Sequence, residues 1–449
     1  MIYVDIINLV IGVSIFTFLI WGAFVSYKEN EFRAMYRMLL ISFFAPVLFS
    51  FPVLHHFSFW YEYSLILWSF SGLVFIILFF PINRKTSKRE IPKSRIDERD
   101  IIFSKRKLKT GTDRYNEYYS AKPQMENVDN KWRKKPGLLQ KDSKYFNAYQ
   151  FAVAEANFET VNQFKKFITG KPANEVIEVN PKDISEFIKN WSIKIGAIDC
   201  GITTLKDYHL YSLKGYDDMY SEPVNNNHKY AIAFVAEMDK GMIDSAPKGS
   251  AVMESAQQYL NLGTVAVQVA SFIRNLGHDA SAHIDGNYQV ICPLVARDAG
   301  LGEIGRMGLL MTPKLGPRVR ISVVTTDLPL IVDESKNDSS VTDFCNICEK
   351  CADACPSGAI PRGARTEIEG VKRWQIDQEA CFSIWCSFGT DCARCMAVCP
   401  YSHPNNLFHN IVRFGIKHFP NFRRPALLMD DFFYGRKPES KKMLDWMEI

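Results

Sequence analysis

The chain has 449 residues, enough for two or three domains and a large core. Its formal net charge is only +5, and the excess Lys and Arg follow an apolar N-terminal stretch without lining a helical face, which argues against nucleic-acid binding. Eleven cysteines could form disulfides, but nine of them crowd into the last third at short spacings, and this pattern is typical of metal ligands.

The N-terminal region, residues 1–83, is far more apolar than the rest of the chain. Uncharged stretches predict three transmembrane helices, over about residues 6–27, 38–58 and 63–83, each long enough to cross a bilayer. A cleaved signal peptide is a weaker interpretation. The first stretch is too long for one, and neither a basic region nor a twin-arginine pair precedes it.

Basic residues indicate the orientation of these spans. Lys28, Arg33 and Arg37 lie between the first two, the next loop has no Lys or Arg, and a basic run follows at residues 84–95. By the positive-inside rule, the N-terminus faces out and everything after residue 83 faces the cytoplasm. The sequence therefore predicts a multi-pass protein of the cytoplasmic membrane.

His55 and His56 lie between the second and third predicted spans and could be haem or quinone ligands. Adjacent histidines point in different directions on a helix, and neither the first nor the third span offers a histidine to complete a bis-His site. We therefore interpret both as interfacial loop residues.

After the spans, residues 84–145 are polar and basic with little periodicity, and they predict an extended cytoplasmic linker. Over residues 146–335, helical segments alternate with short apolar strands, which predicts an α/β or α+β core. Cys200 and Cys292 lie in apparent strands of this core and are interpreted as small buried apolar residues.

Two cysteine runs carry the strongest chemical signal. The first has the C-x2-C-x2-C-x3-C-P spacing of bacterial ferredoxins, and the second ends in the same C-x3-C-P. Crossed ligation predicts one [4Fe–4S] cluster on Cys345, Cys348, Cys351 and Cys399. It predicts a second cluster on Cys355, Cys392, Cys395 and either Cys381 or Cys386. A structural zinc site is the alternative, but the doubled C-x3-C-P endings disfavour it.

The segment Gly300–Gly305, GLGEIG, matches the dinucleotide-binding pattern G-x-G-x-x-G. The residues before it do not end a buried strand, and no acidic-ended second strand follows at the right distance. We interpret the segment as a loop whose backbone approaches another large, flat ligand.

Several long segments together resemble the corrinoid iron-sulfur reductive dehalogenases. They occur in the family's order across about residues 127–435: DNKWRKKPGLL, HLYSLKG, AEMDKGMIDSAP, SFIRNLGHDASAH, DAGLGEIGRMGLLMTPKLGPRVR, TTDLPL, both cysteine runs and DDFFYGRKP. The resemblance implies a nitroreductase-like α/β core that binds cobalamin, over residues 146–335, and a ferredoxin-like two-cluster domain over residues 336–403. It also implies a C-terminal extension, residues 404–449, that packs on the core.

The resemblance further implies an active site. Tyr259, on the helix before the FIR-LG motif, corresponds to the family's proton donor. Arg318, in the GPRVR segment, would lie against the phenol and favour its ionised form, with Arg320 as the nearby competitor. Only one of them is expected to reach the site. Trp385 is expected in the wall of the substrate pocket, with packing around a cluster as the other interpretation.

The same resemblance bears on both cofactors. It implies that Gly300, Gly302 and Gly305 contact cobalamin and that Cys381 is the fourth ligand of the second cluster, since Cys386 looks like a local extra. The histidine motif D-x-H-x-x-G of other cobalamin enzymes is not present, so no histidine ligand to cobalt is expected.

The implied reaction is reductive removal of halide from an organohalide, for instance a halogenated phenol. Electrons would pass through the clusters to cobalamin, which attacks or polarises the halogen-bearing carbon or the halogen itself. Respiratory family members are exported and held by a separate anchor protein, whereas this chain carries its own spans. A fused anchor that collects electrons from menaquinol, or from a reduced ferredoxin or flavoprotein, is therefore expected.

Two other functions remain as alternatives. An epoxyqueuosine reductase-like enzyme would share both cofactor types, but its relatives carry an aspartate where Tyr259 stands and have no membrane spans. A membrane-anchored electron carrier without turnover is the second alternative, and the presence of Tyr259 and Arg318 speaks against it.

Overall fold

The computed structural model describes residues 2–44, 46–55, 58–80, 89–216, 219–334 and 338–448. His56, the basic residues at positions 84, 85 and 88, and the last residues of the third predicted span lie outside this description. The chain divides into two compact units. The helical unit comprises Met1–Lys85 and His403–Pro438, and the core unit comprises Thr86–Ser402 and Glu439–Ile449.

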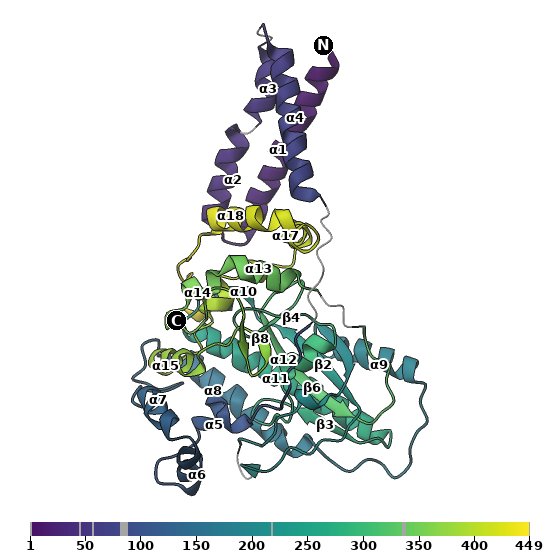
Figure 1. Cartoon of the computed structure of the whole chain (residues 1–449), viewed down its shortest axis with the longest axis vertical. Helices are drawn as coiled ribbons and strands as arrows, with labels where there is room; N and C mark the ends of the chain where they lie inside the picture. The colour runs from purple at the N-terminus through teal and green to yellow at the C-terminus, as the bar shows by residue number, and fades with distance from the viewer. Residues whose placement is uncertain are drawn as a thin grey trace. The chain divides into compact units, whose positions relative to one another are not determined.

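Three stretches of the helical unit are long and apolar enough to cross a membrane: Ile2–Lys28, Phe32–Leu54 and Trp60–Phe79. They correspond to helix α1 (Ile2–Lys28), the pair α2 (Phe32–Phe44) and α3 (Val47–Leu54), and helix α4 (Trp60–Phe79) (Figure 1). Pro46 lies at the start of α3, where its missing N–H is tolerated. The predicted number of apolar spans is confirmed, and all three begin earlier than expected.

The C-terminal helices α17 (Leu407–His418) and α18 (Arg423–Tyr434) also belong to the helical unit, joined by the short turn η6 (Pro420–Phe422). Phe408 and Phe433 are buried among residues of α1 and α2: Ala23, Ala34 and Met38. Residues 403–438 thus belong to the helical unit, and the packing of residues 404–449 on the core stays a prediction. Only residues 439–449, with the turn η7 (Asp445–Met447), belong to the core unit.

The centre of the core unit is a four-stranded antiparallel sheet with the order β1-β2-β6-β3. Its strands are β1 (Asp199–Thr204), β2 (Tyr230–Glu237), β3 (Ala280–His283) and β6 (Val319–Thr326). Successive residues of β2 are buried on alternate faces, Ile232 and Phe234 on one and Ala231 and Ala233 on the other. Both faces must therefore be covered.

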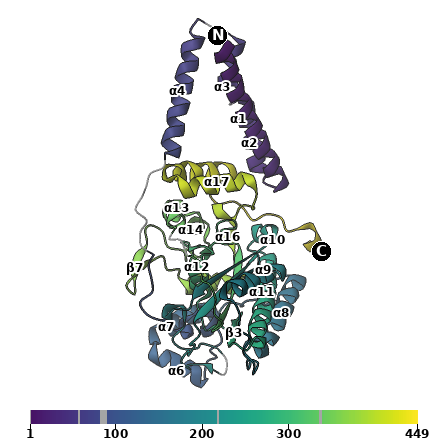
Figure 2. The same ribbon diagram turned by 90° about the vertical axis from the view of Figure 1, so that its right-hand side faces the viewer.

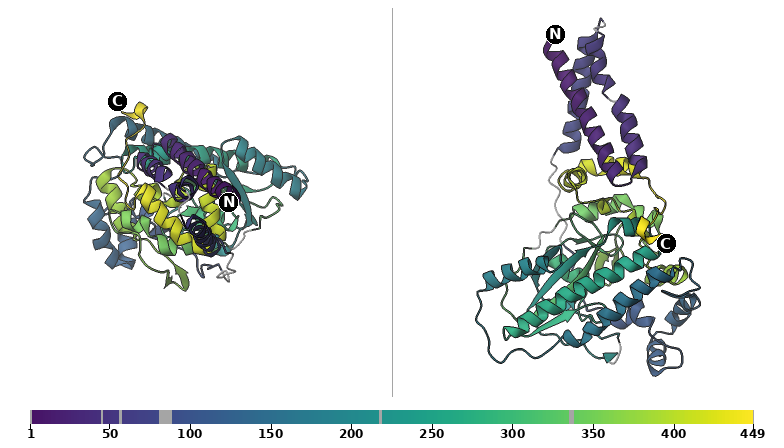
Figure 3. Two further views of the ribbon diagram at one scale, coloured as in Figure 1. Left: turned by 90° about the horizontal axis from the view of Figure 1, so that it is seen from above. Right: turned by 180° about the vertical axis from the view of Figure 1, so that it is seen from behind.

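Helices cover each face of the sheet. On one face lies the long helix α11 (Gly249–Asn275), with α9 (Pro181–Lys194) beside it and α8 (Ala148–Gln163) packed against it (Figure 3, right). On the other lie α12 (Cys292–Asp298) and the hairpin of β4 (Glu303–Ile304) and β5 (Leu310–Met311). The remaining short elements before the cysteine runs are η2 (Phe164–Phe167), η3 (Asp207–His209) and α10 (Lys240–Asp244).

Residues 89–145 are folded, which corrects the prediction of an extended linker. They form η1 (Glu98–Asp100), α5 (Ile102–Lys105), α6 (Asp113–Ala121) and α7 (Pro123–Arg133). Helix α6 buries Tyr115, Tyr118 and Tyr119, which are three and four residues apart and so share one face. Tyrosines at this spacing form a small core. The linker prediction missed it because the segment lacks aliphatic periodicity.

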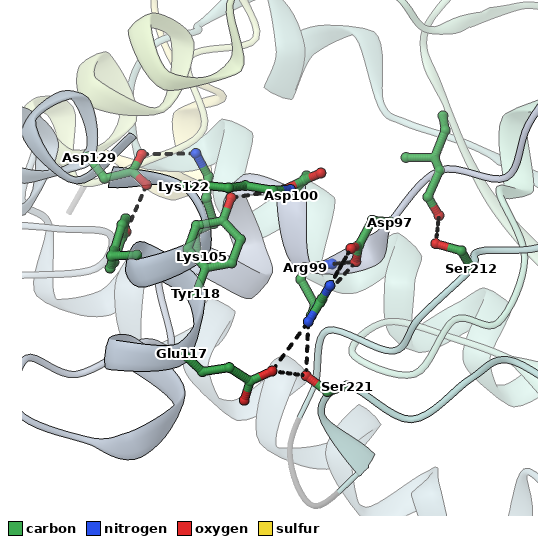
Figure 4. A network of polar contacts seen from close by, with 12 residues as sticks. Asp97, Arg99, Asp100, Lys105, Glu117, Tyr118, Lys122, Asp129, Ser212 and Ser221 are labelled. Carbon is green, nitrogen blue, oxygen red and sulfur yellow. Dashed lines mark hydrogen bonds and ion pairs between the residues drawn. The ribbon is translucent and has the colours of Figure 1, made fainter. Parts of the chain in front are cut away.

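Polar contacts hold this segment in place (Figure 4). The fully buried Lys105 lies 2.9 Å from a carboxylate oxygen of Asp129 and also pairs with Glu379. Tyr119 and Trp132 donate further hydrogen bonds to Asp129, at 2.8 and 3.0 Å. Because its charges are paired inside the protein, the segment looks like a solvated linker in the sequence although it is part of the core unit.

The cysteine runs lie on short helices. The first run spans α13 (Ser340–Cys348) and α14 (Lys350–Ala354), and the second spans α15 (Gln378–Phe388), α16 (Arg394–Ala397) and η5 (Pro400–Ser402). A hairpin of β7 (Thr366–Ile368) and β8 (Val371–Arg373) lies between the two runs in the sequence. Figure 2 shows α13, α14 and α16 close together at one end of the core unit.

Candidate cluster and active site

The two cysteine runs contain the same turn. Glu349, between Cys348 and Cys351, has a left-handed backbone with φ 56°. Ala393 occupies the same place directly after Cys392 and has φ 47°. Residues other than glycine rarely adopt this conformation. Its recurrence shows that the two C-x2-C pairs fold as copies of one motif, each continuing into a short helix.

The thiols gather into two groups. The first surrounds Cys399, whose thiol interacts electrostatically with those of Cys345, Cys348 and Cys351. The second consists of Cys355, Cys381, Cys392 and Cys395. Cys351 also interacts with Cys395, so the two groups adjoin. The structure thus brings together two sets of four thiols, each drawn from both runs.

Cys381 and Cys386, the two alternatives for the last position, lie in different surroundings. Cys381 interacts with Cys355 and Cys392. Cys386 is instead buried in a cluster with Ile102, Trp132 and Phe382, and burial raises the pKa of its thiol to about 11. Although both residues lie on α15, only Cys381 joins a group of thiols.

The thiols of both groups lie in buried or half-buried positions. Burial raises the pKa of Cys381 and Cys351 to about 12, and the charges of neighbouring thiols add to this rise. Buried thiolates are stable only beside a compensating cation, which the irons of a cluster supply. Among the described residues, no three His, Cys, Asp or Glu side chains converge on a point as ligands of one metal ion would.

Tyr259 lies on α11, and its ring faces the guanidinium of Arg320 on β6. The guanidinium carbon is 5.1 Å from the ring centroid. Burial raises the pKa of Tyr259 to about 12, and the positive charge of Arg320 opposes this rise. The pair is therefore arranged so that the arginine favours loss of the phenolic proton.

Arg318 does not occupy the predicted position, and the expectation that it lies against the phenol is wrong. Its Nε donates to the carbonyl of Ser402 at 2.9 Å, and its Nη1 lies 3.0 Å from the carboxylate of Glu237 and also donates to the carbonyl of Met238. Arg318 immediately precedes β6, whereas Arg320 lies within it. The family resemblance therefore indicated the right segment, but the arginine beside Tyr259 is Arg320 and not Arg318.

Two further residues hold Arg320 in place, and neither was predicted from the sequence. Arg320 donates to Ser255 Oγ and lies 3.3 Å from Asp391 Oδ2, and Ser255 donates to the same carboxylate. Ser255 is one helical turn before Tyr259, a spacing that could have revealed it. Asp391 directly precedes Cys392. The arginine beside Tyr259 is thus fixed by the second cysteine run.

Other side chains lie near Tyr259. Tyr216, Asp285 and Tyr288 interact electrostatically with one another and with Tyr259. Burial raises the pKa of all four groups, and each side chain keeps some accessible surface. Aromatic side chains with a few polar groups among them are typical of the lining of a ligand site.

Trp385 lies among aromatic side chains of the core unit. Its ring is 5.8 Å from that of Phe103 and 6.3 Å from that of Phe382, the neighbour of Cys381. These contacts match the interpretation of Trp385 as a packing residue beside a cluster. Its place in a substrate pocket stays a prediction.

The glycines of GLGEIG are required by packing inside the chain. A Cβ at Gly302 would lie 2.3 Å from the carbonyl oxygen of Met311. A Cβ at Gly305 would lie 2.7 Å from the Met311 side chain and 3.7 Å from the Cys345 sulfur. Gly300 has φ +82°. The glycines thus let β4 close onto β5 beside the first thiol group, and their contact with cobalamin stays a prediction.

Comparison with known proteins agrees with this arrangement. Residues 344–403 match the family model of the 4Fe-4S dicluster domain. Tetrachloroethene reductive dehalogenase of Desulfitobacterium hafniense is 36% identical over 216 residues, which are 46% of this chain and 38% of that protein. The enzyme of the same name from Sulfurospirillum multivorans is 36% identical over 217 residues, 46% of this chain and 42% of that one. Over these residues the chain is similar to both tetrachloroethene reductive dehalogenases. It spans about two-fifths of the length of these curated relatives.

Solved structures show the same fold. A catabolic reductive dehalogenase, NpRdhA, in complex with 3-bromo-4-hydroxybenzoic acid matches with a TM-score of 0.62 at 22% identity, over 84% of this chain and 54% of that one. Another reductive dehalogenase structure, described in terms of B12-dependent dehalogenation, matches equally well at 21% identity and covers 57% of its chain. The predicted fold class and the two-cluster domain are confirmed.

Proposed function

We propose that this protein is a membrane-anchored reductive dehalogenase, in which electrons pass through two [4Fe–4S] clusters to cobalamin. The observation that supports it best is the enclosed Tyr259, with Arg320 at its ring and Asp391 linking that arginine to the second cysteine run. The proposed proton donor is thereby connected to the second cysteine run through one arginine.

The proposed ligands follow the two groups of thiols. One cluster is held by Cys345, Cys348, Cys351 and Cys399. The other is held by Cys355, Cys381, Cys392 and Cys395. Because the groups adjoin through Cys351 and Cys395, an electron can move from one cluster to the other within the core unit.

Cobalamin would occupy the space lined by Tyr216, Tyr259, Asp285 and Tyr288, without a histidine ligand from this chain. When bound, it supplies a strongly reducing cobalt centre for cleavage of the carbon–halogen bond. These side chains would provide aromatic surface for a large, flat ligand and a few polar groups that fix its orientation.

Tyr259 would complete the reaction as the proton donor. The substrate accepts two electrons, the carbon–halogen bond breaks, halide leaves, and the phenolic proton of Tyr259 is transferred to the carbon. The Arg320 charge stabilises the phenolate that remains. Ser255 and Asp391 hold the guanidinium in place, since they share its hydrogen bonds.

The substrate is proposed to be an organohalide, with a halogenated phenol as the first to test, since NpRdhA was solved with a brominated hydroxybenzoic acid. We further propose that the N-terminus faces out and the core unit faces the cytoplasm, as the basic residues Lys28, Arg33 and Arg37 indicate. The donor would be menaquinol, or a reduced ferredoxin or flavoprotein.

The test is reconstitution of the purified chain with iron, sulfide and cobalamin, followed by measurement of halide release from bromophenols and chlorophenols with reduced methyl viologen. Retention of corrin and release of halide are expected. A tRNA stem loop carrying epoxyqueuosine serves as the control substrate and should not be converted. No bound corrin, or no halide from any organohalide, would overturn the proposal.

A further inference from the structure

The C-terminal helices contact the ends of all three candidate spans. At the end of α1, Glu29 accepts hydrogen bonds from Asn406 at 2.6 Å and from His409 at 2.9 Å. Burial alone would raise the pKa of Glu29, but the hydrogen bond and charge of His409 outweigh it and lower the pKa. Glu29 is therefore an ionised anchor for α17. Near the start of α2, Arg37 donates to the carbonyl of Phe432 on α18.

The end of α4 is joined to the same segment. Asn421 donates to the carbonyl of Ile77 at 2.9 Å, and the ring of Phe79 lies 5.2 Å from that of Phe419 and 5.3 Å from that of Phe422. In a chain that crosses a membrane three times, the end of the first span, the start of the second and the end of the third lie at the same boundary. Residues 406–432 contact all three ends and therefore lie at that boundary (Figure 2).

Both C-terminal helices expose an apolar stripe. On α17 it consists of Leu407, Ile411 and Phe414, which are 66%, 47% and 57% exposed and are spaced four and three residues apart. On α18 it consists of Leu428, Met429 and Phe432, which are also exposed. Helices with one polar face and one exposed apolar face are typical of segments that lie flat in a membrane interface.

The stripe on α17 continues the apolar surface of the first span. Next to Leu407, the ring of Phe408 packs 5.5 Å from that of Trp21 and 5.6 Å from that of Phe18, both on α1. Phe18 is itself exposed in the middle of its span, where lipid would surround it. The lipid-facing surface therefore runs from α1 onto α17 without a polar break at these residues.

Basic side chains flank the stripes at the same boundary. Lys417 and Arg424 are exposed on the C-terminal helices, and Lys28 and Arg33 are exposed at the facing ends of α1 and α2. Positive charge at this depth complements anionic lipid headgroups. We propose that α17 and α18 lie in the plane of the membrane, with their apolar stripes among the acyl chains of a leaflet that contains anionic phospholipid.

The test uses the full chain with its clusters, reconstituted in vesicles of phosphatidylcholine with or without phosphatidylglycerol. The photoreactive residue p-benzoylphenylalanine replaces Ile411 or Phe414 in the stripe, or Tyr149 or Phe187, which are exposed aromatic residues on α8 and α9 of the core unit. After irradiation, mass spectrometry counts the lipid adducts at each position, and cluster absorbance verifies that each variant is folded. This readout does not depend on dehalogenase activity.

We expect lipid adducts at positions 411 and 414 and few at 149 and 187. Replacing Lys417 and Arg424 together by glutamine should reduce the adducts in vesicles that contain phosphatidylglycerol and leave them unchanged in pure phosphatidylcholine. Adducts spread equally over the four positions, or adducts to protein at 411 and 414, would overturn the placement of α17. Equal yields from both vesicle types would overturn the preference for anionic lipid.

Discussion

Replacing Arg320 by glutamine should weaken Tyr259 as a proton donor. The guanidinium carbon lies 5.1 Å from the ring centroid. At an effective dielectric constant of about 20, a cation at this distance stabilises the phenolate by about 3 kcal/mol. Losing it raises the pKa of Tyr259 by about two pH units. Because only part of this charge develops in the transition state, we expect kcat for halide release to fall about ten- to hundredfold.

Arg318→Gln is the matched control, since Arg318 bonds to Glu237 and to the carbonyls of Met238 and Ser402 and not to the phenol. Arg320→Lys keeps the charge and should retain more turnover than Arg320→Gln. Iron content and thermal unfolding must be measured for each variant, because removing Arg320 also leaves the Asp391 carboxylate without its cation. If Arg318→Gln lowered kcat while Arg320→Gln left it intact, our assignment would be refuted.

Three other substitutions test different parts of the structure. Tyr259→Phe should keep both cofactors and lose about a hundredfold or more in kcat, whereas Tyr208→Phe, which removes a hydrogen bond to Asp298, should leave kcat near that of the parent protein. Cys381→Ser should lose about half of the bound iron, and Cys386→Ser should keep it, as measured by iron analysis and electron paramagnetic resonance. Lys105→Met strands the buried Asp129 and should cost about 3–5 kcal/mol of unfolding free energy. Lys122→Met, which removes a partly exposed ion pair with Asp100, should cost under about 1 kcal/mol in the same denaturant titration.

The predictions from the sequence were best for features that depend on the spacing of residues along the chain. The spans follow from runs of uncharged residues, and the thiol groups follow from the ferredoxin spacing of the two runs. The choice between Cys381 and Cys386 needed the family resemblance, because both precede the C-x2-C pair in the second run. Three residues lie between Cys381 and Trp385, and four lie between Cys381 and Cys386. Spacing alone therefore could not show which of the two cysteines lies on the helix face that meets the other thiols.

The predictions from the sequence failed where charged residues find their partners only in the folded chain. Residues 84–145 were predicted to be a linker because they are rich in charge, yet Lys105 is buried with Asp129 and Glu379. The acidic partners lie 24 and 274 residues away along the chain, so no local pattern announces them. The contact of the C-terminal extension with the end of α1 was missed for a similar reason, because His409 meets Glu29 only in the folded chain.

The single error in the active site has a structural lesson. Arg318 and Arg320 are two residues apart, so on a continuous strand their side chains would share one face, and strand alternation could not choose between them. The start of β6 decides, since Arg318 precedes the strand and bonds to backbone carbonyls and Glu237. Arg320 pairs with Ala236 of β2 and turns toward α11, where Ser255 and Tyr259 lie one turn apart. Shifting β6 by one residue would therefore turn the arginine away from both Tyr259 and Asp391.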